Sequence, residues 1–256
     1  MLILTIKTGE GVMSKKVTGT CALCGKTIKL SFEHIPPRKF DNDEKVNIYH
    51  GDAFFRKNTK YSQEQKGFGL YSLCESCNSL TGSWYNKAFL DFANHIYEIT
   101  PQILTTADNY IKCNNVYPNQ VIKQILSWFC SVNNDDLRID GLRKFVLDKK
   151  SVGINQERFK LLIEFTDIEY IICHGFSEIV CSSDNRIATE IFSEVVFPPF
   201  DFRLILNPNK SVDYWGDITS FSNYEYDESD NILIPIKVKH EKDFPYLDFK
   251  DCDLGE

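Results

Sequence analysis

The sequence predicts an α+β protein, in which an N-terminal domain stapled by a metal precedes helices and an antiparallel β-sheet. Three observations support this fold class. Four cysteines form two Cys-x-x-Cys pairs within the first eighty residues. Apolar residues at steps of three or four follow the second pair, as on one face of a helix. Beyond residue 155, short runs rich in Ile, Val, Phe and Leu alternate with turn residues, as in strands.

The two cysteine pairs predict a structural zinc site. Cys21 and Cys24 are separated by 49 residues from Cys74 and Cys77. Four thiolates satisfy the tetrahedral preference of zinc and leave no open position for catalysis. A chance grouping of buried cysteines is the alternative. The chain shows no export signal, and in a reducing cytoplasm this spacing favours a metal over disulfides.

The segments around the cysteines predict the order of the first elements. Residues 17–32 alternate as a hairpin with a turn at Cys24, Gly25 and Lys26, and the prolines at 36 and 37 end regular structure. Residues 38–66 are polar and predict a long irregular insert. A strand at 70–74 then enters the second cysteine pair, and a helix of about five turns follows Cys77.

The second half of the chain predicts two helices and then a sheet. One helix follows Pro118, and the other covers residues 136–148. The predicted strands are 158–165, 169–173, 178–182, 201–206 and 231–238. A chain of 256 residues is long enough for two modest domains, which we expect at 1–100 and 101–256.

The charge of the chain is divided near residue 100. Residues 1–100 carry 13 Lys and Arg against 10 Asp and Glu, whereas the remainder carries 16 against 26. Only the first part can therefore meet phosphate without general repulsion. No apolar run approaches the roughly 18 residues that cross a membrane, so we expect a cytoplasmic protein without a membrane partner.

Three motifs in order resemble the zinc-containing branch of the HNH endonucleases. They are Cys-Ala-Leu-Cys-Gly at 21–25, Glu-His-Ile-Pro-Pro at 33–37 and Leu-Cys-Glu-Ser-Cys-Asn at 73–78. The resemblance covers about residues 17–95 and implies a ββα-metal, treble-clef domain. By this resemblance, His34 is the general base that activates water, and Glu33 and Asn78 are ligands of a catalytic Mg²⁺ or Mn²⁺.

Elementary chemistry agrees with these roles. Phosphodiester hydrolysis needs an activated water and a cation that stabilises the charge on the phosphorus oxygens. An imidazole that titrates near neutral pH suits the first task. A carboxylate and an amide oxygen suit a hard divalent ion. The sequence thus predicts a metal-dependent endonuclease that cuts DNA, and it leaves RNA open as the alternative substrate. The resemblance suggests restriction or anti-phage defence, in which the acidic second part would be a sensor or a surface that docks a protein partner or activator.

One departure from the family pattern leaves an alternative open. The family usually carries an asparagine five residues before the second cysteine pair, where it braces the loop of the catalytic base, but this chain has Gly69. Asn47 or Ser72 are the candidates to replace it. The alternative is a zinc module that binds nucleic acid or a protein partner and cleaves nothing. A third hypothesis makes the zinc unit a cap for a ligand-binding sheet in the second half.

Overall fold

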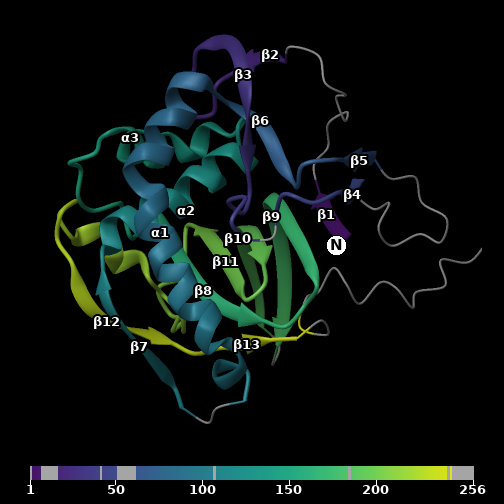
Figure 1. Ribbon diagram of the computed structural model, residues 1–256. Coiled ribbons are helices and arrows are strands. Elements are labelled where there is room, and N and C mark those ends of the chain that lie inside the picture. Colours follow the sequence, from purple (N-terminus) through teal and green to yellow (C-terminus); the bar gives the residue numbers. More distant parts are fainter. Residues whose placement is uncertain are drawn as a thin grey trace, which may run out of the picture.

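The computed structural model shows a mixed α+β protein, which confirms the α+β part of the predicted fold class (Figure 1). The structure describes residues 2–6, 17–40, 42–50, 62–105, 108–183, 186–240 and 243. Within this part of the chain, three α-helices accompany sheets of three, two and eight strands. No helix among these residues has the length and apolar character needed to cross a membrane.

A small antiparallel sheet carries the cysteine motifs at the top of Figure 1. Its strands lie in the order β2 (Thr18–Thr20), β3 (Thr27–His34) and β6 (Gly69–Cys74). The β2–β3 turn is closed by the amide of Cys21 on the carbonyl of Lys26 and by the amide of Gly25 on the carbonyl of Cys21, both at 2.9 Å. Gly25 has a φ of 70°, which glycine adopts without strain. The predicted hairpin and the predicted strand before the second cysteine pair are confirmed.

The polar insert at 38–66 contains two strands that the sequence did not predict. They are β4 (Val46–His50) and β5 (Ser62–Glu64), which pair antiparallel with each other. Val46 and Ile48 are buried, so their alternation drives β4 into a sheet. Residues 51–61 lie outside the described residues, and they include Phe54, Phe55, Arg56, Lys57, Lys60 and Tyr61.

The three helices form where the sequence predicts helices, but with different bounds. Helix α1 (Glu75–Ile103) has 29 residues, or about eight turns, because its apolar face continues to the buried Ile103. Helix α2 (Pro118–Val132) begins with proline in its first turn, a favoured position. A 3₁₀ turn, η2 (Leu137–Ile139), and helix α3 (Asp140–Leu147) occupy the third predicted helix.

The large sheet combines antiparallel and parallel strands. Its order is β13 (Val238–Lys239), β8 (Phe159–Thr166), β11 (Phe200–Leu206), β10 (Arg186–Phe197), β9 (Tyr170–Ser183), β1 (Leu2–Ile6), β4 and β5. The four strands β8 to β11 are antiparallel, as predicted. In contrast, β1 lies parallel to both β4 and β9, and β13 lies parallel to β8. β9 is one strand where the sequence predicted two, and β10 was not predicted.

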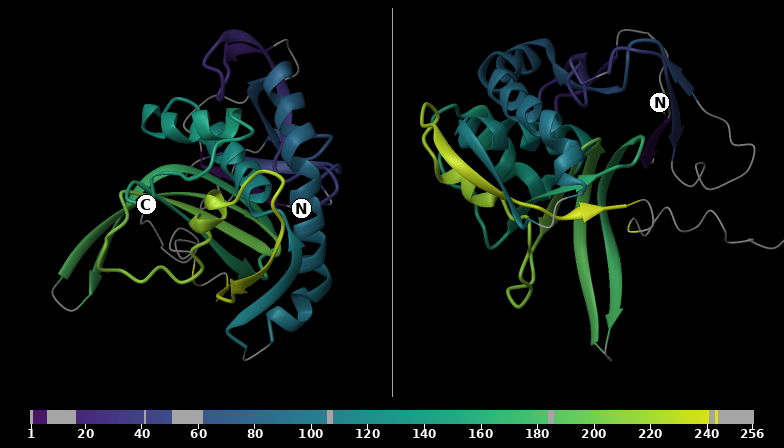
Figure 2. Two further views of the ribbon diagram at one scale, coloured as in Figure 1. Left: turned by 90° about the vertical axis from the view of Figure 1, so that its left-hand side faces the viewer. Right: turned by 60° about the horizontal axis from the view of Figure 1, so that its bottom comes forward.

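A sheet of two strands that are distant in sequence and a projecting hairpin complete the fold. β12 (Asp230–Pro235) pairs with β7 (Tyr110–Val116), which was not predicted as a strand. A short 3₁₀ helix, η3 (Thr219–Asn223), precedes β12. The far ends of β9 and β10 extend beyond the rest of the molecule (Figure 2).

The predicted boundary at residue 100 falls inside α1. One continuous cluster of buried apolar side chains joins both halves of the chain and includes Leu73, Phe89, Trp128 and Phe197. The ring centroids of Phe89 and Trp128 are 4.8 Å apart, and those of Trp128 and Phe197 are 5.7 Å apart. Helices α1 and α2 thus pack on one face of the large sheet through aromatic rings, and β1, β4 and β5 from the first hundred residues extend that sheet.

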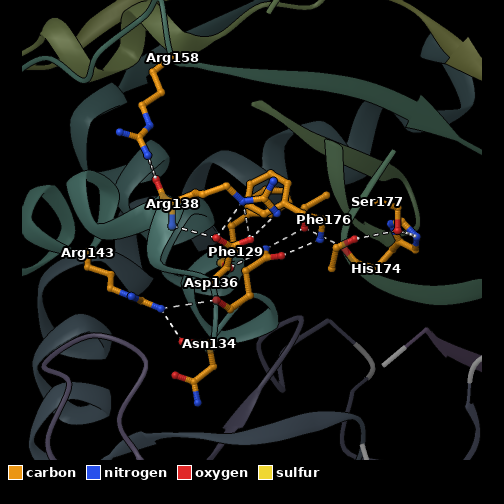
Figure 3. A network of polar contacts seen from close by, with 12 residues as sticks. Phe129, Asn134, Asp136, Arg138, Arg143, Arg158, His174, Phe176 and Ser177 are labelled. Carbon is orange, nitrogen blue, oxygen red and sulfur yellow. Dashed lines mark hydrogen bonds and ion pairs between the residues drawn. The ribbon is translucent and has the colours of Figure 1, made fainter. Parts of the chain in front are cut away.

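The segment after α2 ties the cysteine hairpin to the large sheet, and Figure 3 shows its contact with Phe176 of the sheet. Asn134 Nδ2 donates to the carbonyl of Thr20 at 3.0 Å. Asn133 Nδ2 donates to Ser193 Oγ at 2.9 Å, and the amide of Phe176 donates to Asn133 Oδ1 at 2.7 Å. These bonds fix the C-terminal end of α2 beside the small sheet.

Candidate active site and metal centre

Four cysteines meet at the end of the small sheet, as their spacing predicted. The β2–β3 turn supplies Cys21 and Cys24, and the β6–α1 junction supplies Cys74 and Cys77. Their Sγ atoms all lie within 4.8 Å of one another, and those of Cys24 and Cys74 are 4.0 Å apart. Zinc–sulfur bonds of 2.3 Å place the sulfurs of a tetrahedral site about 3.8 Å apart. The cluster can therefore hold a metal ion after a small contraction.

The backbone around the cluster favours a thiolate. Burial raises the pKa of Cys21, but the amides of Cys24, Cys74 and Leu23 point at its sulfur and lower the pKa by more. The net result is a pKa of about 7. One of these bonds, from the amide of Cys74 to Cys21 Sγ, measures 3.3 Å. Burial raises the pKa of Cys24 and of Cys77. Four sulfurs this close are compatible as thiolates only around a cation.

His34 stands at the end of β3 with one nitrogen engaged. Its Nε2 lies 3.0 Å from the carbonyl oxygen of Lys66, and only a protonated nitrogen can donate to that oxygen. The lone pair of the neutral ring is therefore on Nδ1. Burial lowers the pKa of His34, and the positive charge of Arg38 lowers it further, against the opposing effect of the Lys66 carbonyl. His34 thus presents a neutral imidazole that can accept a proton at Nδ1.

Asn42 braces the loop that follows His34. Its Nδ2 donates to the carbonyls of Pro36 at 2.6 Å and Phe68 at 2.8 Å, and its Oδ1 accepts from the amide of Phe68 at 2.5 Å. Asn42 is completely buried. It therefore links the loop to the segment before β6, which is the role expected of the family's asparagine.

Asn47 and Ser72, the residues expected to take over this role, have other partners. Asn47 Oδ1 accepts from Gln63 Nε2 at 2.9 Å at the edge of the large sheet, and Ser72 Oγ donates to Glu33. Asn42 was not predicted as the brace, because it lies in a polar run that has no fixed spacing to either cysteine pair.

Two glycines allow the brace to form. A Cβ on Gly69 would lie 2.1 Å from the carbonyl oxygen of Glu33, so no side chain fits at this position in the present packing. Gly67 has a φ of 82°, and a Cβ there would lie 1.9 Å from the carbonyl oxygen of Asn42. Gly69 is thus explained by the close approach of β3 and β6, and bracing is supplied from elsewhere.

Glu33 is buried between the small sheet and α2. Its Oε2 accepts from Ser72 Oγ at 3.2 Å and from Ser131 Oγ, which belongs to α2. Burial raises the pKa of Glu33 to about 7, although both serine bonds lower it. Because both serines bind the same oxygen, Oε1 keeps its lone pairs for another partner.

Asn78 follows the second cysteine pair in the first turn of α1. Its Nδ2 donates to Ser31 Oγ at 3.1 Å and to the carbonyl of Phe32 at 3.3 Å. Ser31 Oγ itself donates to the carbonyl of Leu73, so it must accept from Asn78. This network fixes the amide orientation and leaves Asn78 Oδ1 as the oxygen that can meet a cation or a donor.

All three predicted site residues line one cavity of about 330 Å³. Arg38 and Lys39 also line it, and both are exposed. Its full lining is Phe32, Glu33, His34, Pro37, Arg38, Lys39, Asn78, Thr81, Gly82, Asn86, Gln124 and Trp128. A carboxylate oxygen and an amide oxygen fit a hard divalent ion that keeps water and substrate oxygens as its other ligands. Gln124 and Trp128 of this lining belong to α2, which lies outside the motifs that predicted the site.

A larger hollow of about 470 Å³ lies elsewhere and contains none of the predicted residues. Arg138, Asn155, Glu157, Arg158, Leu206 and Asn207 line it. Its arginines are already engaged, since Arg138 pairs with Asp136 at 2.6 Å and Arg158 donates to the Arg138 carbonyl at 2.7 Å (Figure 3). The smaller cavity, at His34, is therefore the better candidate for an active site.

Comparison with known proteins found no relative: no protein-family model, no curated protein and no solved structure matches this chain. Functional assignment therefore depends on the cysteine cluster and on the cavity at His34.

Proposed function

We propose that this protein is a metal-dependent endonuclease that hydrolyses phosphodiester bonds in DNA. The observation that carries the proposal is the common cavity of His34, Glu33 and Asn78, in which His34 has its free nitrogen fixed by the bond to Lys66. Two exposed cations, Arg38 and Lys39, line the same cavity and suit a phosphate.

The proposed chemistry divides among four groups of residues. His34 takes a proton from the attacking water at Nδ1. Glu33 Oε1 and Asn78 Oδ1 would hold Mg²⁺ or Mn²⁺, which stabilises the charge on the phosphorus oxygens when bound. Arg38 and Lys39 attract and orient the phosphate. The four cysteines would hold a zinc ion that fixes the strands carrying these residues and takes no part in the reaction.

Plasmid cleavage tests the proposal. Purified protein is incubated with supercoiled DNA in Mg²⁺ or Mn²⁺, and in the same buffer without either ion. We expect wild type to nick DNA only with the divalent ion and His34→Ala to lose about 10²–10⁴-fold in rate, the usual contribution of a general base. His95→Ala is the matched control, because His95 also contacts a backbone carbonyl, that of Lys112, but lies outside the cavity.

A second candidate function is a zinc module that binds nucleic acid or a protein partner without cleaving it. One observation favours it: burial raises the pKa of Glu33 to about 7 although the two serine bonds lower it, so much of Glu33 is uncharged at neutral pH without a cation. Equal nicking by wild type and His34→Ala would contradict His34 as the general base and, with it, the proposed active site. Metal-dependent binding of DNA without cleavage would favour the binding module.

A further inference from the structure

The cavity continues beyond the proposed catalytic residues along the groove between α1 and α2. Asn78, Gly82 and Asn86 follow one another at steps of four residues and so lie on one face of α1. From Asn78 to Asn86 this face extends about 12 Å, at 1.5 Å per residue. Gln124 lines the same cavity from α2. Gly82, Asn86 and Gln124, which we term the amide recess, have no role in the chemistry proposed above.

Gln124 offers a buried acceptor to this recess. The side chain is only 6% exposed, and its Oε1 has no hydrogen-bond partner among the described residues. Its Nε2 donates to Ser127 Oγ at 3.3 Å, and Ser127 Oγ donates to the Gln124 carbonyl at 2.8 Å. Because the serine hydrogen is already used, the amide cannot be turned round. A buried oxygen without a donor is unfavourable, so a ligand that supplies a donor would relieve this cost.

Gly82 is an exposed member of the cavity lining and adds no side chain to it. It lies inside α1, where glycine is less favourable than alanine. A Cβ on Gly82 would meet no atom within 4 Å, so no close packing explains the glycine. A longer side chain at this position would enter the space between Asn78 and Asn86.

We propose that the amide recess binds the base of an unpaired nucleotide next to the scissile phosphate, an inference that rests on the proposed nuclease function. Gln124 Oε1 needs an N–H donor, and nucleobases carry such donors on their Watson–Crick edges. In a duplex these donors are paired, so only a single-stranded or flipped-out base can present them. Asn86 adds an amide donor and acceptor beside Gln124, and the cavity volume is in the range of sites for small ligands.

Binding measurements without Mg²⁺ or Mn²⁺ test the recess separately from cleavage. Fluorescence anisotropy compares a single-stranded DNA oligonucleotide, an abasic strand of equal length and charge, and the corresponding duplex. We expect wild type to bind the single strand at least about tenfold more tightly than either competitor, as for one buried hydrogen bond and its base contacts. An RNA strand of the same sequence shows whether the sugar matters.

Variants of the recess should abolish this preference for bases. Gln124→Leu removes the acceptor, and Gly82→Leu fills the space, so the ratio of abasic to single-strand Kd should fall toward one. Gly82→Ala should weaken single-strand binding while raising the melting temperature, since alanine favours the helix. That combination excludes misfolding as the cause. Ser83→Leu is the matched control, because Ser83 is exposed on α1 and outside the cavity lining.

Two results would overturn the recess: equal affinity of wild type for the single strand and the abasic strand, or unchanged preference in Gln124→Leu and Gly82→Leu. In either case the unpaired Gln124 Oε1 does not mark a base-binding site. If base-dependent binding is found but wild type does not nick plasmid, the recess stands and the nuclease proposal fails. If wild type nicks plasmid without any base preference, the nuclease stands and the recess fails.

Discussion

Glu33 and His34 are consecutive residues of β3, and their side chains have different surroundings. Glu33 is bonded to serines of β6 and α2, whereas His34 is bonded to the Lys66 carbonyl. Burial favours the uncharged form of both, so it raises the pKa of Glu33 and lowers that of His34. For His34 this is the form that can act as a base. For Glu33 it is the protonated form, so a divalent ion that binds the carboxylate has to displace the proton.

The stability of the metal-free protein should therefore depend on Glu33 and on pH. Because the folded-state pKa of about 7 exceeds the ordinary value of 4.5, Glu33 stabilises the fold at pH below 4.5, and this contribution disappears as the pH rises through 7. Glu33→Gln removes the titration. Relative to wild type, we expect the variant to gain up to about 3 kcal/mol between pH 5 and pH 8.

Urea denaturation at the two pH values, with zinc present and without Mg²⁺ or Mn²⁺, measures this difference. Glu75→Gln serves as the control, because Glu75 is exposed on α1. A stability difference between wild type and Glu33→Gln that does not change with pH would contradict the burial of an uncharged carboxyl.

The sequence predicts those site residues that lie at fixed distances from a motif. The cysteine spacing predicts the metal cluster, and the resemblance points to Glu33, His34 and Asn78, which the structure brings to one cavity. Asn42, Ser131 and Gln124 carry no such signal. Each reaches the site only because the insert or α2 folds against the small sheet, and that contact depends on tertiary packing.

At the scale of elements, α2 connects the candidate site with the rest of the molecule. The sequence predicts this helix and one apolar face, at Val121, Ile125 and Phe129, but in the structure almost every residue of α2 is buried. Its other face carries Gln124 and Ser131 toward the cavity and Glu33. Sequence periodicity identifies apolar faces, so a buried polar face is invisible to it.

Lys123 holds α2 in place from the opposite side. It is completely buried, and its Nζ donates to the carbonyls of Asp148 at 2.7 Å, Ser151 at 2.9 Å and Lys149 at 3.2 Å. Burial lowers the pKa of Lys123 to about 8. This ammonium group satisfies carbonyls just beyond the end of α3, where no helical amide is left to bind them.

Lys123→Met should lower the free energy of unfolding by about 3 kcal/mol, because it leaves these carbonyls without a donor in the interior. Urea denaturation with an unchanged m-value provides the measurement. Lys144→Met is the control, since Lys144 is exposed on α3. An equally small effect of both substitutions would show that water replaces the ammonium group.

The strands that were not predicted contain residues that are unfavourable, by themselves, in a buried position or in a strand. β10 includes Glu194, which is completely buried and pairs with Arg203 of β11 at 2.9 Å and Lys239 of β13 at 3.1 Å. β7 includes Asn115, which has a positive φ of 54°. Charged and amide residues are unfavourable in strands unless partners from other strands surround them, and those partners are distant in sequence.

At the scale of the whole molecule, the first hundred residues and the remainder share one core. Two domains were predicted from the change in charge and texture near residue 100, but α1 crosses that point and packs on the large sheet through Phe89. Asn134 binds the β2 strand beside the cysteine cluster. The state of the cluster should therefore affect the stability of the entire molecule.

We expect a chelator that removes the proposed zinc ion to lower the melting temperature of the whole chain in a single calorimetric transition. Without the ion, the four cysteines no longer join the β2–β3 turn to the start of α1. The small sheet, against which α1 and α2 pack, is then less stable. We expect a decrease on the order of 10 °C or more, as a loss of several kcal/mol implies for a chain of this size. Wild type should contain one equivalent of zinc by elemental analysis and Cys21→Ser less, whereas Cys113→Ala, outside the cluster, should keep it. Two independent domains would instead give a second transition that is unchanged by the chelator, so one calorimetric experiment distinguishes a shared core from a detachable zinc module.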